Sequence, residues 1–186
     1  NISVRFNEGL LITPSAVDYN DLSDGDIVYL DLSGNVSEES RLQPSSEWHF
    51  HRDLYQSRAD INAIVHAHPI YCTALACTGR SIPAFHYMVA IAGGKDIPIA
   101  PYALFGTEQL SKNVVMSLRS RQACLMENHG MISVGSDLTA AFKLAEEVEI
   151  LAKQYSIALK LGGVKVLGDQ EMEEVLDKFA HYGKRL

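Results

Sequence analysis

The chain has 186 residues, 47% of them apolar, and a net charge of −7 from 16 basic and 23 acidic side chains. This length predicts a single domain over residues 1–186 that buries a core without needing a metal or disulfide to hold it together. The acidic balance argues against nucleic acid and anionic membrane surfaces as partners, since both need a basic patch. There is no apolar stretch long enough to span a membrane and no signal-peptide pattern, so we expect a soluble, cytoplasmic protein.

The first half of the chain alternates between strand and helix signals. Apolar or β-rich runs that end in proline or in turn residues predict strands over 9–13, 26–32 and 61–68. Ser45 and Ser46 follow a proline and precede Glu47, which predicts a helix with a serine cap and an acid in its first turn. Two short apolar helices are expected next, over 70–78 and 86–93.

The second half adds the remaining elements. We expect a strand at 97–100, a helix from 106 to about 119, and two strand pieces within 123–134 around a glycine. Apolar residues at three- and four-residue spacing predict a long helix over 138–161, and a last helix is expected over 170–181. Short hairpin-like strands mixed with helices predict an α/β fold with a mostly antiparallel sheet covered by helices. No Gly-rich phosphate loop of Rossmann or P-loop spacing occurs.

Three of the seven histidines suggest a metal site. His66 and His68 stand at i and i+2 near the end of a predicted strand, so both imidazoles point to one face. His129 is the best third ligand, because Gly130 beside it lets another group approach closely. The alternatives are polar residues at a strand end and a histidine satisfied by a backbone carbonyl. The other histidines are interpreted as solvated or packing residues (His49, His51 and His181), with His86 left open.

Glu47 is the carboxylate that stands out. The hydroxyls of Ser45 and Ser46 lie beside the unpaired N–H groups of a helix start, an arrangement that binds phosphate. By itself, this pattern is also typical of a plain helix cap with a first-turn acid. Together with the His66–His68 pair, it suggests a site that holds an anionic group of a metal-bound substrate while Glu47 moves a proton.

Eight motifs, in order over essentially the whole chain, resemble the zinc-dependent class II aldolase and adducin family. They are Asn1-Ile2-Ser3-Val4-Arg5, Leu11-Ile12-Thr13-Pro14-Ser15, Pro44-Ser45-Ser46-Glu47-Trp48, His66-Ala67-His68, His86-Tyr87-Met88, Pro101-Tyr102-Ala103-Leu104-Phe105-Gly106-Thr107, Asn128-His129-Gly130 and Phe179-Ala180-His181-Tyr182-Gly183. The resemblance implies a three-layer α/β/α fold. It also implies a family helix ahead of Asn1, which this sequence does not include.

The resemblance assigns roles to individual residues. It implies one Zn²⁺ per subunit, held by His66, His68 and His129, with Glu47 as catalytic acid/base and as a further ligand when substrate is absent. Two tyrosines, Tyr87 and Tyr182, are implied in proton transfer and substrate positioning, and the second reaches a neighbouring subunit of a homotetramer. The implied phosphate-binding residues are Asn1, Ser15, Ala16, Ser45 and Ser46.

The implied reaction is the reversible cleavage of a 1-phosphorylated ketose into dihydroxyacetone phosphate and a small aldehyde. L-Fuculose 1-phosphate, which would give L-lactaldehyde, is the expected substrate. The alternatives are an aldolase or dehydratase for methylthioribulose or deoxyribulose phosphate, a ribulose phosphate 4-epimerase, a decarboxylase, or an adducin-like scaffold. Family epimerases carry aspartate in place of Glu47, and the scaffolds lack the complete metal triad. One departure is Ala16, where the family often has glycine.

Overall fold

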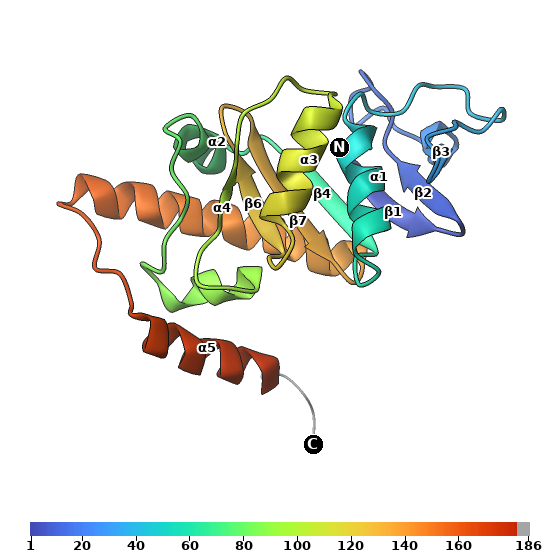
Figure 1. The fold of residues 1–186 in the computed structure, drawn as a ribbon. Helices are drawn as coiled ribbons and strands as arrows, with labels where there is room; N and C mark the ends of the chain where they lie inside the picture. The colour runs from blue at the N-terminus through green and yellow to red at the C-terminus, as the bar shows by residue number, and fades with distance from the viewer. Residues whose placement is uncertain (182–186) are drawn as a thin grey trace.

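A seven-stranded sheet forms the centre of the molecule, as the computed structural model shows for the residues that it describes, 1–181 (Figure 1). The strand order is β3-β2-β1-β4-β7-β6-β5. All neighbours pair antiparallel except β5 and β6, which are parallel, so the sheet is mixed rather than strictly antiparallel. The strands are β1 (Ile2–Phe6), β2 (Gly9–Ile12), β3 (Val28–Asp31), β4 (Ala63–Ala67), β5 (Ile99–Ala100), β6 (Ala123–Met126) and β7 (Gly130–Gly135).

Helices cover both faces of this sheet. The α-helices are α1 (Trp48–Ser57), α2 (Ile70–Ala76), α3 (Glu108–Ser117), α4 (Leu138–Lys160) and α5 (Asp169–His181), with 3-10 turns η1 (Asp24–Asp26) and η2 (Tyr87–Ala92). Helices α1 and α3 pack together on one face, while α2 and α4 pack together on the other (Figure 1). Helix α5 lies against η2. The predicted three-layer α/β/α architecture is thereby confirmed.

The period-two alternation of the strands divides the core into two parts. On β6, Cys124 and Met126 belong to the cluster that contains Phe50 of α1, whereas Leu125 belongs to the cluster that contains Val148 of α4. Each of these side chains is essentially inaccessible to solvent. Because successive side chains of a strand point to opposite faces, a sheet buried on both sides needs apolar residues at every position.

Two local features differ from the sequence-based expectations. Strand β1 is absent from the sequence-based expectations, although Ile2, Val4 and Phe6 alternate with polar residues as in a half-buried strand; β2 and β4 pair with it on either side. The helix predicted to begin at the two serines begins at Trp48, and Glu47 occupies the N-cap position. A turn in which the Trp48 N–H donates to the Ser45 carbonyl at 3.1 Å precedes the helix.

The fold places the C-terminal end of the middle strand, β4, beside the start of α1. Strand β4 ends at Ala67, the β6–β7 turn lies next to that end through the β4–β7 pairing, and α1 begins nearby. Strand β1 runs on the other side of β4, where the Asn1 carbonyl accepts from the His66 N–H at 2.9 Å. Over residues 1–181, no helix is both long and apolar enough to cross a membrane.

Candidate metal centre and active site

Four side chains from three separate segments converge at the C-terminal end of β4. Glu47 comes from the N-cap of α1, His66 and His68 from the end of β4, and His129 from the β6–β7 turn. One ligand atom from each lies within 4.8 Å of the others. The structure therefore brings together the three histidines and the carboxylate that the sequence singled out.

The two histidines of β4 lie on one face, as the strand spacing predicts. Their Nε2 atoms are 2.9 Å apart. His66 is buried and its Nδ1 lies 2.9 Å from the Met131 carbonyl on β7. A carbonyl oxygen only accepts, so Nδ1 carries a proton, and in the neutral ring Nε2 presents a lone pair to the cluster. His68 lies one residue beyond the strand and is exposed, which leaves the cluster open on that side.

The β6–β7 turn delivers His129. Asn128 adopts φ 54°, a left-handed conformation that asparagine tolerates, and the His129 N–H donates to the Met126 carbonyl at 3.0 Å. A Cβ on Gly130 would lie 2.5 Å from the Ala67 carbonyl oxygen and 2.6 Å from His68 Cδ2. The glycine thus permits the close approach that the sequence predicted beside His129, and the group that approaches is the end of β4.

Glu47 is buried and faces two of the histidines. Its Oε2 lies 3.1 Å from His66 Nε2, and its Oε1 lies 3.2 Å from His129 Nε2. Burial alone would raise the pKa of Glu47, but the hydrogen bond and charge of His66, the charge of His129 and a hydrogen bond from Asn1 lower it to about 2. The carboxylate is therefore ionised at neutral pH.

The donor set fits a divalent cation. Burial lowers the pKa of His129 to about 4 and also lowers that of His68, so both imidazoles are neutral, the form that binds metal. Nε2 of His66 lies 2.9 Å from His68 Nε2 and 3.1 Å from Glu47 Oε2, and with neutral rings the lone pairs of these atoms repel one another unless a proton or a metal ion lies between them. Within residues 1–181, Oε1 of Glu47 is also a buried atom without a hydrogen-bond partner. Three imidazole nitrogens and one carboxylate oxygen form a set typical of zinc.

A cavity of about 350 Å³ opens beside the cluster. The 101–107 loop forms one wall, where the Tyr102 N–H donates to the Glu127 carboxylate at 2.9 Å and Gly106 lies against the Ser46 carbonyl. The cavity is lined by Ser46, Glu47, His68, Tyr102, Ala103, Phe105, Asn128 and His129. It is large enough for a small substrate that reaches the metal ligands.

The segments expected to bind phosphate lie side by side. Pro14 and Pro44 form an antiparallel bridge, with Ser15 N–H donating to the Gln43 carbonyl at 3.0 Å and Ser45 N–H donating to the Thr13 carbonyl at 3.1 Å. This bridge brings the exposed residues Ser15, Ala16 and Ser46 next to the buried Ser45. Ala16 adopts φ 58°, a conformation that a glycine would adopt without strain. Asn1 differs, because its amide nitrogen donates to Glu47 Oε2 at 3.1 Å.

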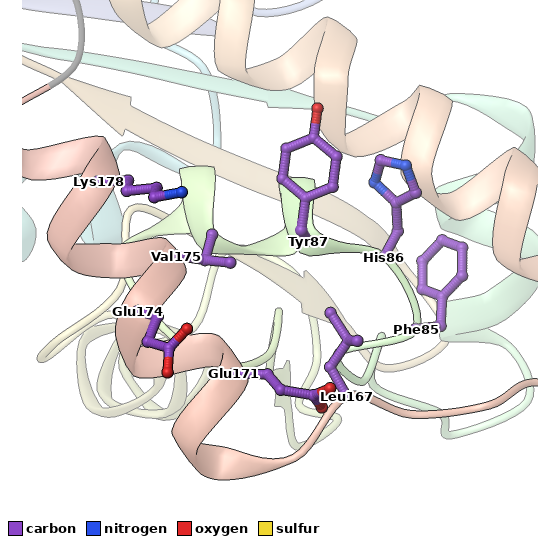
Figure 2. Close-up of a pocket in the computed structure, with 8 residues that line it drawn as sticks. All are labelled: Phe85, His86, Tyr87, Leu167, Glu171, Glu174, Val175 and Lys178. Atoms are coloured by element: carbon purple, nitrogen blue, oxygen red, sulfur yellow. The ribbon is translucent and has the colours of Figure 1, made fainter.

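Tyr87 does not line the cavity beside this cluster. Tyr87 is 51% exposed on η2 and lines a groove against α5, together with His86, Val175 and Lys178 (Figure 2). That groove and the cavity beside Glu47 are lined by different residues. Tyr182 lies outside the described residues.

His51 lies close to the site, although the sequence suggests only a solvated or packing role for it. His51 is fully buried, and its two ring nitrogens lie 2.7 Å from Ser3 Oγ and from Asn1 Oδ1. His51 follows Glu47 by four residues, which puts both on one face of a helix. That spacing is the sequence signal that links His51 to the site.

Comparison with known proteins agrees with this geometry. Residues 1–156 match the family described as Class II Aldolase and Adducin N-terminal domain. L-fuculose phosphate aldolase of Escherichia coli K12 is 49% identical over 187 residues, which cover 100% of this chain and 86% of that protein. The 5-methylthioribulose-1-phosphate/5-deoxyribulose-1-phosphate aldolase of Rhodospirillum rubrum is 51% identical over 183 residues, 98% of this chain and 82% of that protein.

A solved structure shows that the likeness extends to the fold. An L-fuculose 1-phosphate aldolase superimposes with a TM-score of 0.92 at 44% identity, covering 96% of this chain and 84% of the other. The chain belongs to the class II aldolase and adducin family.

Proposed function

We propose that this protein is a zinc-dependent aldolase that reversibly cleaves a 1-phosphorylated ketose into dihydroxyacetone phosphate and a small aldehyde. The observation that carries this proposal is the convergence of Glu47, His66, His68 and His129 within 4.8 Å, with an ionised carboxylate beside neutral imidazoles. An adducin-like scaffold has no need of this set. The relatives at 49% and 51% identity are named as an L-fuculose phosphate aldolase and a 5-methylthioribulose-1-phosphate/5-deoxyribulose-1-phosphate aldolase, which supports the same reaction class.

The three histidines and Glu47 would hold the metal. Bound there, a zinc ion would act as a Lewis acid that polarises the ketone and its neighbouring hydroxyl oxygen. His66 contributes orientation as well as a lone pair, because its Nδ1 is fixed by the Met131 carbonyl. His68 is the exposed ligand and lines the substrate cavity, so the bound substrate lies on its side of the cluster.

Glu47 is the proposed acid/base. In cleavage, Tyr87 would remove the proton from the hydroxyl of the departing aldehyde fragment, and Glu47 would protonate the carbon that is left electron-rich when the bond breaks. In synthesis, Glu47 would remove that proton and the hydroxyl proton would return to the new alcohol. Glu47 Oε1 is the oxygen left without a hydrogen bond among residues 1–181, so this atom has a lone pair for the proton. Its pKa of about 2 makes the carboxylate a weak base in the metal-free protein, so proton removal by Glu47 would depend on the Lewis acidity that a bound ion supplies.

The substrate phosphate is proposed to bind where the 13–16 and 43–46 segments meet. Ser15, Ser45 and Ser46 supply hydroxyls there, and Ala16 turns the backbone through a left-handed conformation. Asn1 is included in the proposed cradle because of the family resemblance, although its amide nitrogen donates to Glu47 Oε2 at 3.1 Å. Hydroxyls and N–H groups bind an anion without lysine or arginine, consistent with a chain that carries a net charge of −7.

We also propose a cytoplasmic homotetramer with active sites at the subunit interfaces. Tyr87 is exposed and lines a groove apart from the metal cluster of its own subunit (Figure 2). A tyrosine at that position serves the reaction only if a neighbouring subunit brings it to the cluster. Tyr182 is proposed to act across the same kind of interface.

The two kinds of relative are named for different sugar phosphates, which would release different aldehydes, so the experiment must identify the aldehyde. The test is a panel containing L-fuculose 1-phosphate, 5-deoxyribulose 1-phosphate and 5-methylthioribulose 1-phosphate, incubated with zinc-loaded protein. Dihydroxyacetone phosphate and the aldehyde are both quantified. Equal amounts of the two products identify an aldolase. The ketose phosphate that is cleaved fastest identifies the aldehyde that the enzyme releases. A dehydrated or epimerised product would instead indicate a sister enzyme, and no turnover of any ketose by fully loaded protein would overturn the proposal.

A further inference from the structure

A line of buried polar side chains leads away from the metal cluster into the core. Tyr55 OH lies 2.8 Å from Ser3 Oγ, which lies 2.7 Å from His51 Nδ1. His51 Nε2 lies 2.7 Å from Asn1 Oδ1, and Asn1 Nδ2 lies 3.1 Å from Glu47 Oε2. Tyr55, Ser3 and His51 are 2%, 2% and 0% exposed. The line joins β1 to α1, on which positions 47, 51 and 55 share one face through their four-residue spacing.

The direction of each hydrogen bond in this line can be derived by starting from the Glu47 carboxylate. An ionised carboxylate only accepts, so the Asn1 amide nitrogen donates to Glu47 and the Asn1 oxygen faces His51. That oxygen also only accepts, so His51 carries its proton on Nε2 and has a bare Nδ1. Ser3 must then donate its only hydroxyl proton to Nδ1, which leaves its oxygen to accept from Tyr55. The reverse order would set a bare Nε2 against Asn1 Oδ1, two acceptors at 2.7 Å.

The burial of Tyr55 and His51 supports this order of donors and acceptors. Burial raises the pKa of Tyr55, so its hydroxyl retains the proton that it donates. Burial likewise holds the pKa of His51 well below its usual value, so the ring is neutral and has one protonated nitrogen. The Arg5 guanidinium lies 4.9 Å over the Tyr55 ring and donates to the Tyr55 carbonyl at 2.9 Å, which fixes the far end.

We infer that His51 is a positioning residue for the proton transfer, acting through Asn1 to orient Glu47. All four donors point toward the carboxylate, so they fix Oε2 in place and leave Oε1 as the oxygen that gives and takes the substrate proton. The inference rests on the proposed role of Glu47 as acid/base. It also assigns Asn1 a second task beyond the phosphate, because its amide nitrogen is held against Glu47 rather than turned to the cavity.

Two substitutions of His51 separate positioning from packing. In His51→Gln the terminal amide extends to the place of Nε2 and still donates to Asn1, but it gives up the acceptor for Ser3. In His51→Asn the shorter amide occupies the place of Nδ1, so it still accepts from Ser3 but ends short of Asn1. Both variants put a neutral amide into the same buried space, which makes each the control for the other.

The measurement is the exchange of the dihydroxyacetone phosphate C–H proton with solvent, together with zinc content and thermal unfolding. We expect His51→Gln to exchange near the wild-type rate and His51→Asn to be slower by roughly tenfold to a hundredfold, the usual effect of a misplaced catalytic group. Zinc content and KM should match in the two variants. Equal exchange rates in both, after correction for the folded fraction, would overturn the inference.

A spectroscopic test is independent of catalysis and of the variants' folding. ¹⁵N NMR of the wild-type protein, with and without zinc, should show His51 as the neutral Nε2–H tautomer. An Nδ1–H tautomer would contradict the donor order. If wild-type protein cleaves no ketose phosphate, the proposed function fails while the tautomer can still be read. If it cleaves them and the two variants exchange alike, only the positioning role of His51 fails.

Discussion

The Nδ1 proton of His66 is donated to the backbone carbonyl of Met131, 2.9 Å away on the neighbouring strand. The β4–β7 register pairs His66 with Ile132, which sets that carbonyl beside the ring. Sheet pairing thereby selects the tautomer that leaves Nε2 free for metal. The geometry of the candidate ligand set is therefore built into one of the two central pairings of the sheet.

The first prediction concerns metal binding. His66→Ala and His68→Ala should each lose zinc, because a site with one imidazole removed loses both a ligand and its fixed geometry. His181→Ala removes an exposed imidazole at the end of α5 and should keep zinc content unchanged. Zinc per chain is measured by elemental analysis after dialysis. Full occupancy in both of the first two variants would contradict the ligand assignment.

The second prediction concerns Glu47. Glu47→Gln should slow solvent exchange of the dihydroxyacetone phosphate proton by at least about a hundredfold, because the amide can neither accept nor deliver that proton. The three histidines remain, so zinc should be retained. Glu38→Gln, on the exposed surface, is the matched control and should exchange at the wild-type rate. Exchange that is unaffected in Glu47→Gln would remove this residue from the mechanism.

Sequence reasoning identified the residues of the candidate metal site because their positions follow local rules. The i, i+2 spacing of His66 and His68 on a strand, and the glycine after His129, each have a geometric meaning that does not depend on the rest of the fold. The same is true of the long helix, predicted over 138–161 and found at Leu138–Lys160. Apolar residues that recur at helical spacing over six turns predict a helix and do not fit the period-two pattern of a strand.

The parts that sequence reasoning missed depend on contacts between distant segments. Strand β1 exists through its pairing with β2 and β4, and Ser3 within it is buried because His51 and Tyr55 satisfy its hydroxyl. A serine in a short strand is usually read as solvent-facing. Likewise Tyr87 lies in a motif that resembles the family's, yet only the fold shows that it lines a groove with α5 instead of the metal site.

The third prediction is a loss of stability in acid. The pKa of His51 is far below its unfolded value of 6.5, and that of His129 is lowered to about 4. Below pH 6.5 the unfolded chain therefore binds protons that the folded chain does not, so stability falls as pH falls, by up to about 1.4 kcal/mol per pH unit for each group. Glu47, with its pKa lowered from 4.5 to about 2, adds a further loss below pH 4.5.

Urea unfolding of metal-free protein at pH 7.5 and 5.5 measures this dependence. His51→Gln removes one of the titrating groups, so the difference in free energy of unfolding between the two pH values should be smaller in the variant. An identical difference in wild type and variant would show that His51 is not the buried neutral group described above.

The fourth prediction concerns Gly130. In Gly130→Ala the new Cβ would meet the Ala67 carbonyl and the His68 ring, so the turn or the ring must move. We expect a loss of about 1–3 kcal/mol in stability, the usual cost of overpacking, together with weaker zinc binding. Gly25→Ala, where an added Cβ meets only Ser23 Oγ at 4.0 Å, is the control. Wild-type zinc affinity in Gly130→Ala would mean that His68 is not held by this contact.

The last prediction concerns the alanine in the phosphate segment. Ala16 adopts φ 58°, a conformation that costs an L-residue roughly 1–2 kcal/mol and costs glycine almost nothing. Glycine also adds freedom to the unfolded chain, worth about 0.5–1 kcal/mol, so Ala16→Gly should leave stability unchanged or raise it by up to about 1.5 kcal/mol. Ala145→Gly, inside α4, should lower stability by about 1 kcal/mol or more. Urea unfolding of both variants decides the matter, because equal losses would show that the backbone at Ala16 is unstrained.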